Sequence, residues 1–267
     1  MAVMSELSSP SRRITPLGWL PLSLQYKIIK SVAPAGGPDV GDEDSWGERK
    51  LRTLLGESFF TEIAGKTVVD FGCGEGRQSV QIAKAGAKKV YGLDIQPHYL
   101  EAARKEAERN GYAQICEFRQ QLPDSVKADV VVSIDSFEHF GDPEGVLREM
   151  KRIMKPDAVL VVSFGYPWYH PLGGHLFSVF PWAHLVFSEA ALIRWRSDVR
   201  DDGATRFEEV AGGLNQMTIK RFERIAREGG LVVEKLEVTA IRPLRWLHCG
   251  FTREFTSSVI RARLRRA

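Results

Sequence analysis

Apolar positions between residues 66 and 164 alternate between two periods, one typical of buried strands and the other of amphipathic helices. Compact apolar runs predict five strands, at 66–71, 89–93, 115–118, 129–134 and 158–164. Helical spacing between these runs predicts three helices, at 76–84, from Pro97 to a stop at Asn110, and from Asp142 to a stop at Pro156. Since strands alternate with helices, the pattern predicts a parallel sheet covered on both faces.

The pattern is different on the N-terminal side of this region. Residues 1–15 are rich in Ser, Pro and Arg, and we expect them to be mobile. Residues 16–31 predict a short amphipathic helix or arm, and residues 45–64 predict a further helix. The glycines and prolines between these two segments predict a flexible connection.

The pattern also breaks on the C-terminal side. Residues 165–216 carry many aromatic side chains but show no regular period. A segment of this length after the fifth strand predicts a lid folded over the carboxyl edge of the sheet. Regular structure resumes at Thr218, which predicts the cap of a helix ending at Gly229. Two last strands follow, at 231–238 and 255–264.

These elements together predict one α/β fold with four parts. The fold class is a Rossmann-like, doubly wound sheet of seven strands, mostly parallel with one antiparallel strand, with a lid insertion after strand five. We expect a mobile arm and short helix at 1–44, a cofactor-binding core at 45–164, a substrate-binding lid at 165–216, and the C-terminal part of the core at 217–267.

The composition narrows the class of protein without deciding its function. The chain has 267 residues, of which 43% are hydrophobic and 27% charged, as in ordinary globular domains. A net charge of +3 is too small to indicate nucleic-acid binding by itself. We find no secretory-signal pattern and no apolar run near the roughly 20 residues of a membrane span. The three cysteines are far apart and fit a reducing compartment, so we expect a cytoplasmic protein.

The loop after the first strand is the most informative segment of the chain. Glycines at 72, 74 and 76 allow a tight turn and let a ligand approach the backbone. A dinucleotide site has the spacing G-x-G-x-x-G, which places a pyrophosphate at a helix N-terminus. Here the spacing is G-x-G-x-G, and Asp70 precedes it. An acid at that position would repel a pyrophosphate and would suit a cationic amino-acid group.

A second acid supports a nucleoside cofactor. Asp94 ends the second strand, about twenty residues after the glycine loop, where a carboxylate can bind both hydroxyls of a ribose. Ile95 follows it and can pack on an adenine. A glycine loop that serves only as a strand–helix turn would not require this acid.

These segments closely resemble the class I S-adenosylmethionine-dependent methyltransferases, small-molecule type. The resemblance covers residues 45–164 and 218–264, and it departs from the family at Met154–Ala158, where Pro-Gly-Gly is more usual. It implies S-adenosyl-L-methionine as the cofactor and the loop residues Asp70, Gly72, Cys73, Gly74 and Gly76 as its binding site. It further implies that Asp94 binds the ribose, Ile95, Gln121 and Leu122 lie near the adenine, and Ser133 and Ile134 offer backbone groups beside the methionine.

The lid carries the candidates for the methyl acceptor. Its aromatic side chains suit an apolar or aromatic acceptor, or they pack as ordinary lid core. We take Tyr166, Trp168, Tyr169 and His184 as candidate substrate-binding residues. The candidate general bases are His139, His170 and His175, because histidine titrates near neutral pH. The lid histidines fit no standard zinc spacing, and we expect no metal.

Each of two charged segments can be interpreted either as solvated surface or as a binding site. Arg194, Arg196 and Arg200 predict a solvated helix face, or a site for a substrate carboxylate or phosphate. Seven arginines from Arg242 onward predict a solvated strand and tail, or contact with an anionic substrate, a membrane surface or nucleic acid.

The sequence therefore predicts transfer of a methyl group to a small, apolar or aromatic metabolite, with oxygen as the favoured acceptor atom. The alternative is methyl transfer to RNA, to a protein or to a membrane-associated lipid, and a third hypothesis is a binding module without turnover. A separate RNA-binding domain is not evident, so we expect no nucleic-acid partner. Membrane contact and the oligomeric state stay open.

Overall fold

A seven-stranded sheet forms the centre of the protein, whose computed structural model describes residues 15–33, 47–200, 202–210 and 213–267. The strand order is β3-β2-β1-β4-β5-β7-β6, and β7 alone runs antiparallel to its neighbours. The predicted fold class is therefore confirmed. The strands are β1 Thr67–Phe71, β2 Lys89–Leu93, β3 Cys116–Arg119, β4 Ala128–Ile134, β5 Met154–Phe164, β6 Leu231–Ala240 and β7 Ser257–Arg266.

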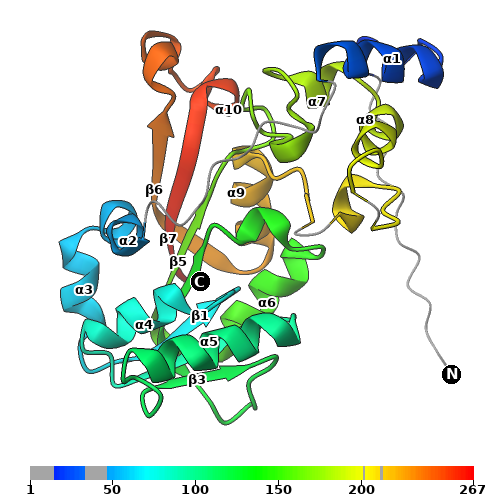
Figure 1. Cartoon of the computed structure of the whole chain (residues 1–267). Helices are drawn as coiled ribbons and strands as arrows, with labels where there is room; N and C mark the ends of the chain where they lie inside the picture. Colours follow the sequence, from blue (N-terminus) through cyan, green and yellow to red (C-terminus); the bar gives the residue numbers. More distant parts are fainter. Residues whose placement is uncertain (1–14, 34–46, 201, 211–212) are drawn as a thin grey trace, which may run out of the picture.

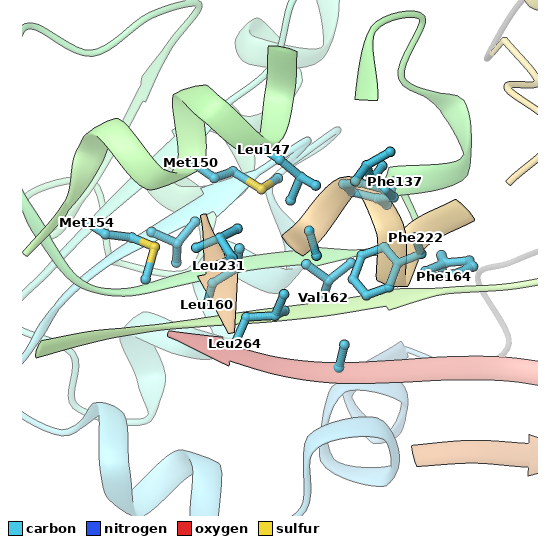
Figure 2. Packing of buried hydrophobic residues seen from close by; sticks show 14 of the residues in the cluster. Phe137, Leu147, Met150, Met154, Leu160, Val162, Phe164, Phe222, Leu231 and Leu264 are labelled. Atoms are coloured by element: carbon cyan, nitrogen blue, oxygen red, sulfur yellow. The ribbon is translucent and has the colours of Figure 1, made fainter. Parts of the chain in front are cut away.

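Helices cover both faces of the sheet because its central strands are apolar on both faces. In β5, Leu160, Val162 and Phe164 belong to one hydrophobic cluster, while Val159 and Val161 belong to the other. The first cluster is covered by α6 Pro143–Ile153 and α9 Ile219–Glu228, and Figure 2 shows their side chains over β5 and β7. The second is covered by α2 Gly47–Leu55, α3 Glu57–Ile63, α4 Arg77–Lys84 and α5 Pro97–Arg109.

Two local predictions about the core need correction. The helix predicted at 45–64 is two helices, because Gly56 between α2 and α3 has a φ of 75° that ends the first one. The fifth strand begins at Met154 rather than Ala158, since Met154 pairs with Ala128 before the register shifts. Pro156 thus lies inside the strand, next to this irregularity.

Local capping signals predicted from the sequence are present. Asp142 accepts a hydrogen bond from the Gly145 amide at 2.8 Å, and Thr218 accepts one from the Arg221 amide at 3.0 Å. The last strand begins two residues later than predicted, because Arg253–Thr256 forms the short helix α10 before β7. Between β6 and α10 lies the 3₁₀ helix η5, Arg242–Leu247.

The segment predicted as a lid has its own apolar cluster. It contains η3 His175–Phe177, α7 Ala183–Val186, α8 Glu189–Arg196 and η4 Phe207–Glu209. Its core includes Phe177, Phe187, Leu192, Trp195 and Phe207 and also takes in Ile29 from the N-terminal helix α1, Leu22–Val32. Figure 1 shows α1 and α8 next to each other, away from the sheet.

Hydrogen bonds tie α1 to the lid. The Gln25 side chain accepts from the Ser188 amide at 2.9 Å, and the Trp195 indole donates to the Ala33 carbonyl at 2.9 Å. Within the described part of the chain, α1 is thus an element of the lid rather than an independent arm. The predictions for residues 1–14 and 34–44 lie outside the described residues.

Candidate cofactor and acceptor site

The loop joining β1 to α4 takes a shape that requires glycine. Gly72, Gly74 and Gly76 have φ values of 82°, 50° and 78°, in the left-handed region that side chains disfavour. A Cβ on Gly72 would lie 2.7 Å from the Ser136 side chain, and one on Gly76 would lie 2.7 Å from Ala103. A Cβ on Gly74 would meet nothing within 4 Å. Gly72 and Gly76 thus serve close packing, and Gly74 leaves the backbone open to a ligand.

Asp70 is fully buried directly below this loop. Its Oδ2 accepts a hydrogen bond from the Ser79 hydroxyl at 2.6 Å, while Oδ1 has no partner among the described residues. Burial raises the pKa of the Asp70 carboxyl from 3.8 to about 6, against the opposing effect of the Ser79 hydrogen bond. A cation placed beside Oδ1 would offset this desolvation, so the residue fits the cationic end of a ligand.

Asp94 lies on the opposite side of the loop, at the end of β2. Its Oδ2 accepts from the Gly74 amide at 3.0 Å, and its Oδ1 accepts from the Gln96 amide at 2.9 Å. These bonds fix the carboxylate while leaving acceptor capacity on both oxygens, since an ionised carboxylate has about four lone-pair sites. Ile95, next in the chain, is 79% exposed and so has an apolar face available for a base.

The remaining predicted cofactor residues surround this loop in different ways. Ser133 and Ile134 are buried at the carboxyl end of β4, where the Ser133 and Ser136 hydroxyls lie 2.8 Å apart. Gln121 lines a depression of about 330 Å³ beside the start of α5, whereas the Leu122 side chain is buried in the core. Cys73 is buried in the turn, and this burial raises the pKa of its thiol well above the usual range, which disfavours the thiolate.

The loop and the fold together match a known family. A family model described as a methyltransferase domain matches residues 63–204. This chain belongs to the methyltransferase-domain family. The predicted recognition as a class I methyltransferase is confirmed, and with it the enzyme class and S-adenosylmethionine as the family's cofactor.

Individual relatives of this methyltransferase show where the similarity lies. It is 42% identical to the ribosomal protein L11 methyltransferase of Vibrio campbellii over 108 residues, which make up 38% of this chain and 34% of that protein. The similar region thus spans about a third of the length of the curated relative.

Two solved structures share the fold along most of their length. One is the magnesium protoporphyrin IX methyltransferase of Synechocystis PCC 6803, with a TM-score of 0.53 at 18% identity, covering 91% of this chain and 94% of that one. The other is a SAM-dependent methyltransferase of Aquifex aeolicus, with a TM-score of 0.51 at 16% identity, covering 90% and 97%.

Several predicted acceptor-side residues form a cluster with the segment that follows β4. The segment η2, Phe137–His139, follows β4, and Phe140 lies against Phe71 with ring centroids 5.9 Å apart. The His139 ring lies 5.3 Å from the His175 ring, which lies 6.3 Å from Tyr166. Tyr166 in turn stacks on His170 at 4.2 Å. The methyltransferase thus brings four of its predicted residues together in one cluster that begins at η2.

Hydrogen bonds distinguish the histidines of this cluster. His139 Nδ1 lies 2.9 Å from the Gly213 carbonyl, which can only accept, so the neutral ring leaves Nε2 as the proton acceptor. His170 is the reverse case, because its Nδ1 accepts from the Leu172 amide at 2.9 Å and the proton must sit on Nε2. His175 Nε2 is buried, and none of the described polar groups bonds to it. Burial lowers the pKa values of His170 and His175 to about 4.

The other two lid candidates have structural surroundings. His184 is buried with both ring nitrogens in contact, Nδ1 with the Ser178 hydroxyl at 3.1 Å and Nε2 with the Trp168 carbonyl at 2.7 Å. Trp168 is itself buried in the lid core, whereas Tyr166 is partly exposed and Tyr169 lies against Phe255. The geometry favours Tyr166 over Trp168 and His184 as a substrate contact, and these assignments stay predictions.

Three polar residues of the site were not among the predicted ones. The Ser136 hydroxyl donates to the Phe71 carbonyl at 3.1 Å, Glu138 accepts from the Gly165 amide at 3.0 Å, and the Asn215 amide donates to the Phe137 and Phe140 carbonyls. They hold η2 in place. An acid four residues after the apolar fourth strand, as at Glu138, was a signal available in the sequence.

The charged segments have mostly structural partners. Arg196 is buried and makes two 2.7 Å hydrogen bonds to Asp202, so the predicted solvated helix face is wrong for this residue. Arg253, Arg261, Arg263 and Arg265 pair with glutamates. The described residues contain no cluster of metal-ligating side chains and no helix long and apolar enough to cross a bilayer.

Proposed function

We propose that this chain transfers a methyl group from S-adenosylmethionine to an acceptor held between η2 and the lid. The observation that carries the proposal is the pair of acids around the open Gly74 backbone. Asp70 presents a buried carboxylate oxygen without a described partner, as a cationic group requires, and Asp94 is fixed where ribose hydroxyls can bind.

The chain's own residues have three roles in the proposed reaction. When bound, S-adenosylmethionine supplies a methyl group activated by its sulfonium charge. The residues of η2 and the lid would hold the acceptor in line with the methyl group, and such alignment can lower the barrier by several kcal/mol. The proton lost by the acceptor would pass to Nε2 of His139, the ring nitrogen that accepts when Nδ1 donates to the Gly213 carbonyl. The lid excludes water from this step.

The class of acceptor has two candidates. The partly exposed Tyr166 and the adjacent rings of His139 and His175 support a small apolar or aromatic molecule methylated on oxygen. The Vibrio relative is named for methylation of a ribosomal protein, which supports a protein acceptor more directly, although the match covers 34% of that protein. A cytoplasmic location, inferred from three separate free cysteines, accompanies either candidate.

Transfer of a labelled methyl group separates these candidates. The purified chain is incubated with methyl-labelled S-adenosylmethionine and a cell extract fractionated into metabolites, proteins, RNA and lipids. Label in the metabolite fraction supports the first candidate, and label in the protein fraction supports the second. Label in no fraction, despite measurable cofactor binding, would contradict catalysis and favour a binding module.

A further inference from the structure

The connection between β6 and β7 carries large apolar side chains that the fold leaves uncovered. Trp246 is 81% exposed and Phe251 is 98% exposed, and Leu247 and Phe255 are also exposed. They lie on η5, on the turn before α10 and on α10 itself, at the end of the hairpin that Figure 1 shows projecting beyond the sheet. An isolated exposed apolar residue needs no explanation, but four on one projection indicate an interaction surface.

The positive charge of this projection indicates that its partner is negatively charged. Residues 241–253 contain three arginines and no acid. Arg253 pairs with Glu223 on α9, whereas Arg242 and Arg245 are exposed and make no ion pair with any described residue. These two arginines are three positions apart in a 3₁₀ helix, which places them on the same face. The projection therefore combines aromatic side chains with positive charge.

A second exposed apolar group lies at the same end of the molecule. Trp19 is 78% exposed, and Leu22, Leu24 and Val32 on or beside α1 are also exposed, with Lys27 between them. In Figure 1 the hairpin tip and α1 both reach the top of the view, with α7 below and between them. One flat surface could touch both groups.

We propose that this end of the molecule, the hairpin tip and α1, docks on an anionic lipid bilayer. Tryptophan is enriched at the headgroup level of membranes, and basic residues near the surface are attracted to anionic lipids. A single-stranded RNA would also attract arginines and aromatic rings, but it binds along a groove by base stacking. Here the tip is a projection, and Leu22, Leu24, Val32 and Leu247 offer aliphatic surface that gains by burial rather than by stacking.

A second copy of the chain fits this surface less well. A stable dimer needs a matched surface of about 800 Å² per partner on a continuous face. The exposed side chains instead occupy two separate projections. A bilayer also explains the pairing of apolar and basic residues, since it presents hydrocarbon and phosphate at neighbouring depths.

Docking is tested with the full chain and vesicles, without cofactor or acceptor, so the result does not depend on the proposed function. The probe is co-sedimentation with phosphatidylcholine vesicles, with and without phosphatidylglycerol. We expect binding to the anionic vesicles that weakens as salt is added. The double variant Trp246→Ser with Phe251→Ser should reduce the partition coefficient at least about tenfold. Val232→Ser, a half-exposed apolar residue at the start of β6, is the matched control and should bind as the wild type.

The basic component is tested by charge reversal. Arg245→Glu should weaken binding to anionic vesicles by about tenfold, while Lys88→Glu, an exposed lysine in the loop before β2, should have little effect. All four variants change exposed side chains, and circular dichroism checks that each is folded. Equal pelleting of the tip variants and the wild type would overturn the proposal. So would binding of a labelled RNA oligonucleotide, or concentration-dependent dimerisation, in place of vesicle binding.

Discussion

Asp70 shows how one buried carboxyl can link folding to ligand binding. The folded protein raises the pKa of Asp70 from 3.8 to about 6, so the folded state holds the proton more tightly than the unfolded state. The contribution of this proton to stability is fully present below about pH 4 and is lost as the pH rises through about 6. A shift of this size corresponds to roughly 3 kcal/mol of unfolding free energy.

The first prediction follows from this linkage. Without cofactor, Asp70→Asn should lose less stability than the wild type between pH 5 and pH 8, because the amide cannot ionise. Urea denaturation at the two pH values measures the difference, with the exposed Asp157→Asn as control. The same variant should bind S-adenosylmethionine more weakly. An identical pH dependence in Asp70→Asn and the wild type would show that Asp70 does not carry this effect.

His139 and His170 give the second prediction, since their hydrogen bonds assign them opposite tautomers. His139→Gln should lower kcat about 100-fold with little change in cofactor affinity, because a general base acts on the acceptor alone. His170→Gln should change kcat less than about fivefold. Single-turnover methyl transfer measures both. A larger loss in His170→Gln than in His139→Gln would reverse the assignment.

At the scale of elements, two glycines of the β1–α4 loop have different expected roles, Gly76 in packing and Gly74 in ligand binding. Gly76→Ala should destabilise the fold by about 2 kcal/mol or more, because its Cβ would lie 2.7 Å from Ala103 and its φ is 78°. Gly74→Ala meets no neighbouring atom and should cost only about 1 kcal/mol for its positive φ. Its methyl group nevertheless occupies the space left for a ligand.

The third prediction is therefore that one substitution lowers cofactor affinity and the other lowers stability. Gly74→Ala should unfold close to the wild-type urea midpoint and bind S-adenosylmethionine at least about tenfold more weakly. Gly76→Ala should show the larger shift in midpoint. Chemical denaturation and calorimetry measure the two quantities. Wild-type affinity in Gly74→Ala would mean that the ligand does not approach this backbone.

Elements with local signals were predictable from the sequence, and elements held by distant contacts were not. The strands follow from apolar runs, and the Asp142 and Thr218 caps follow from bonds within three residues. The N-terminus of α9 also needs Glu254, which accepts from the Ile219 and Lys220 amides across about 35 positions of chain. No periodicity indicates such a contact. The aromatic lid packs irregularly for the same reason, so its helices were missed apart from the helix face predicted at Arg194 and Arg196, which lies on α8.

The candidate site was likewise predictable where its residues are close in the chain, and not where distant segments meet. Asp70, Asp94 and the three glycines were identified because a ligand loop needs them at fixed spacing between a strand and a helix. The contact of His139 with His175 depends on how the lid folds, and Asn215 acts on η2 from more than 70 positions away. Roles on the acceptor side therefore required the structure.

At the scale of the whole molecule, the lid has an apolar cluster separate from the two clusters of the sheet. The helix α1 belongs to the lid cluster. Gln25 joins α1 to the lid, since it is buried and bonds to both the Ser188 amide and the Leu20 carbonyl. Removing its side chain leaves two partly buried backbone groups without this partner, at a cost of up to about 1–3 kcal/mol each. We expect this loss of stability to be confined to the lid.

The fourth prediction is a local rather than a global opening. Gln25→Ala should speed amide hydrogen exchange in α8 while β1 and β4 keep wild-type protection, because the sheet does not depend on this contact. Ser23→Ala, an exposed change on the same helix, is the control. Faster exchange throughout the sheet would show that lid and sheet unfold together.

The central claim is that the loop from Asp70 to Gly76, together with Asp94, binds S-adenosylmethionine. Isothermal titration calorimetry of the wild type, Asp94→Ala and the exposed control Asp157→Ala tests it most directly. The account predicts saturable binding by the wild type and by Asp157→Ala. Binding by Asp94→Ala should be at least about tenfold weaker, as expected when charge-assisted hydrogen bonds to a ribose are lost. Equal affinity in all three proteins, or no binding by the wild type, would contradict the claim.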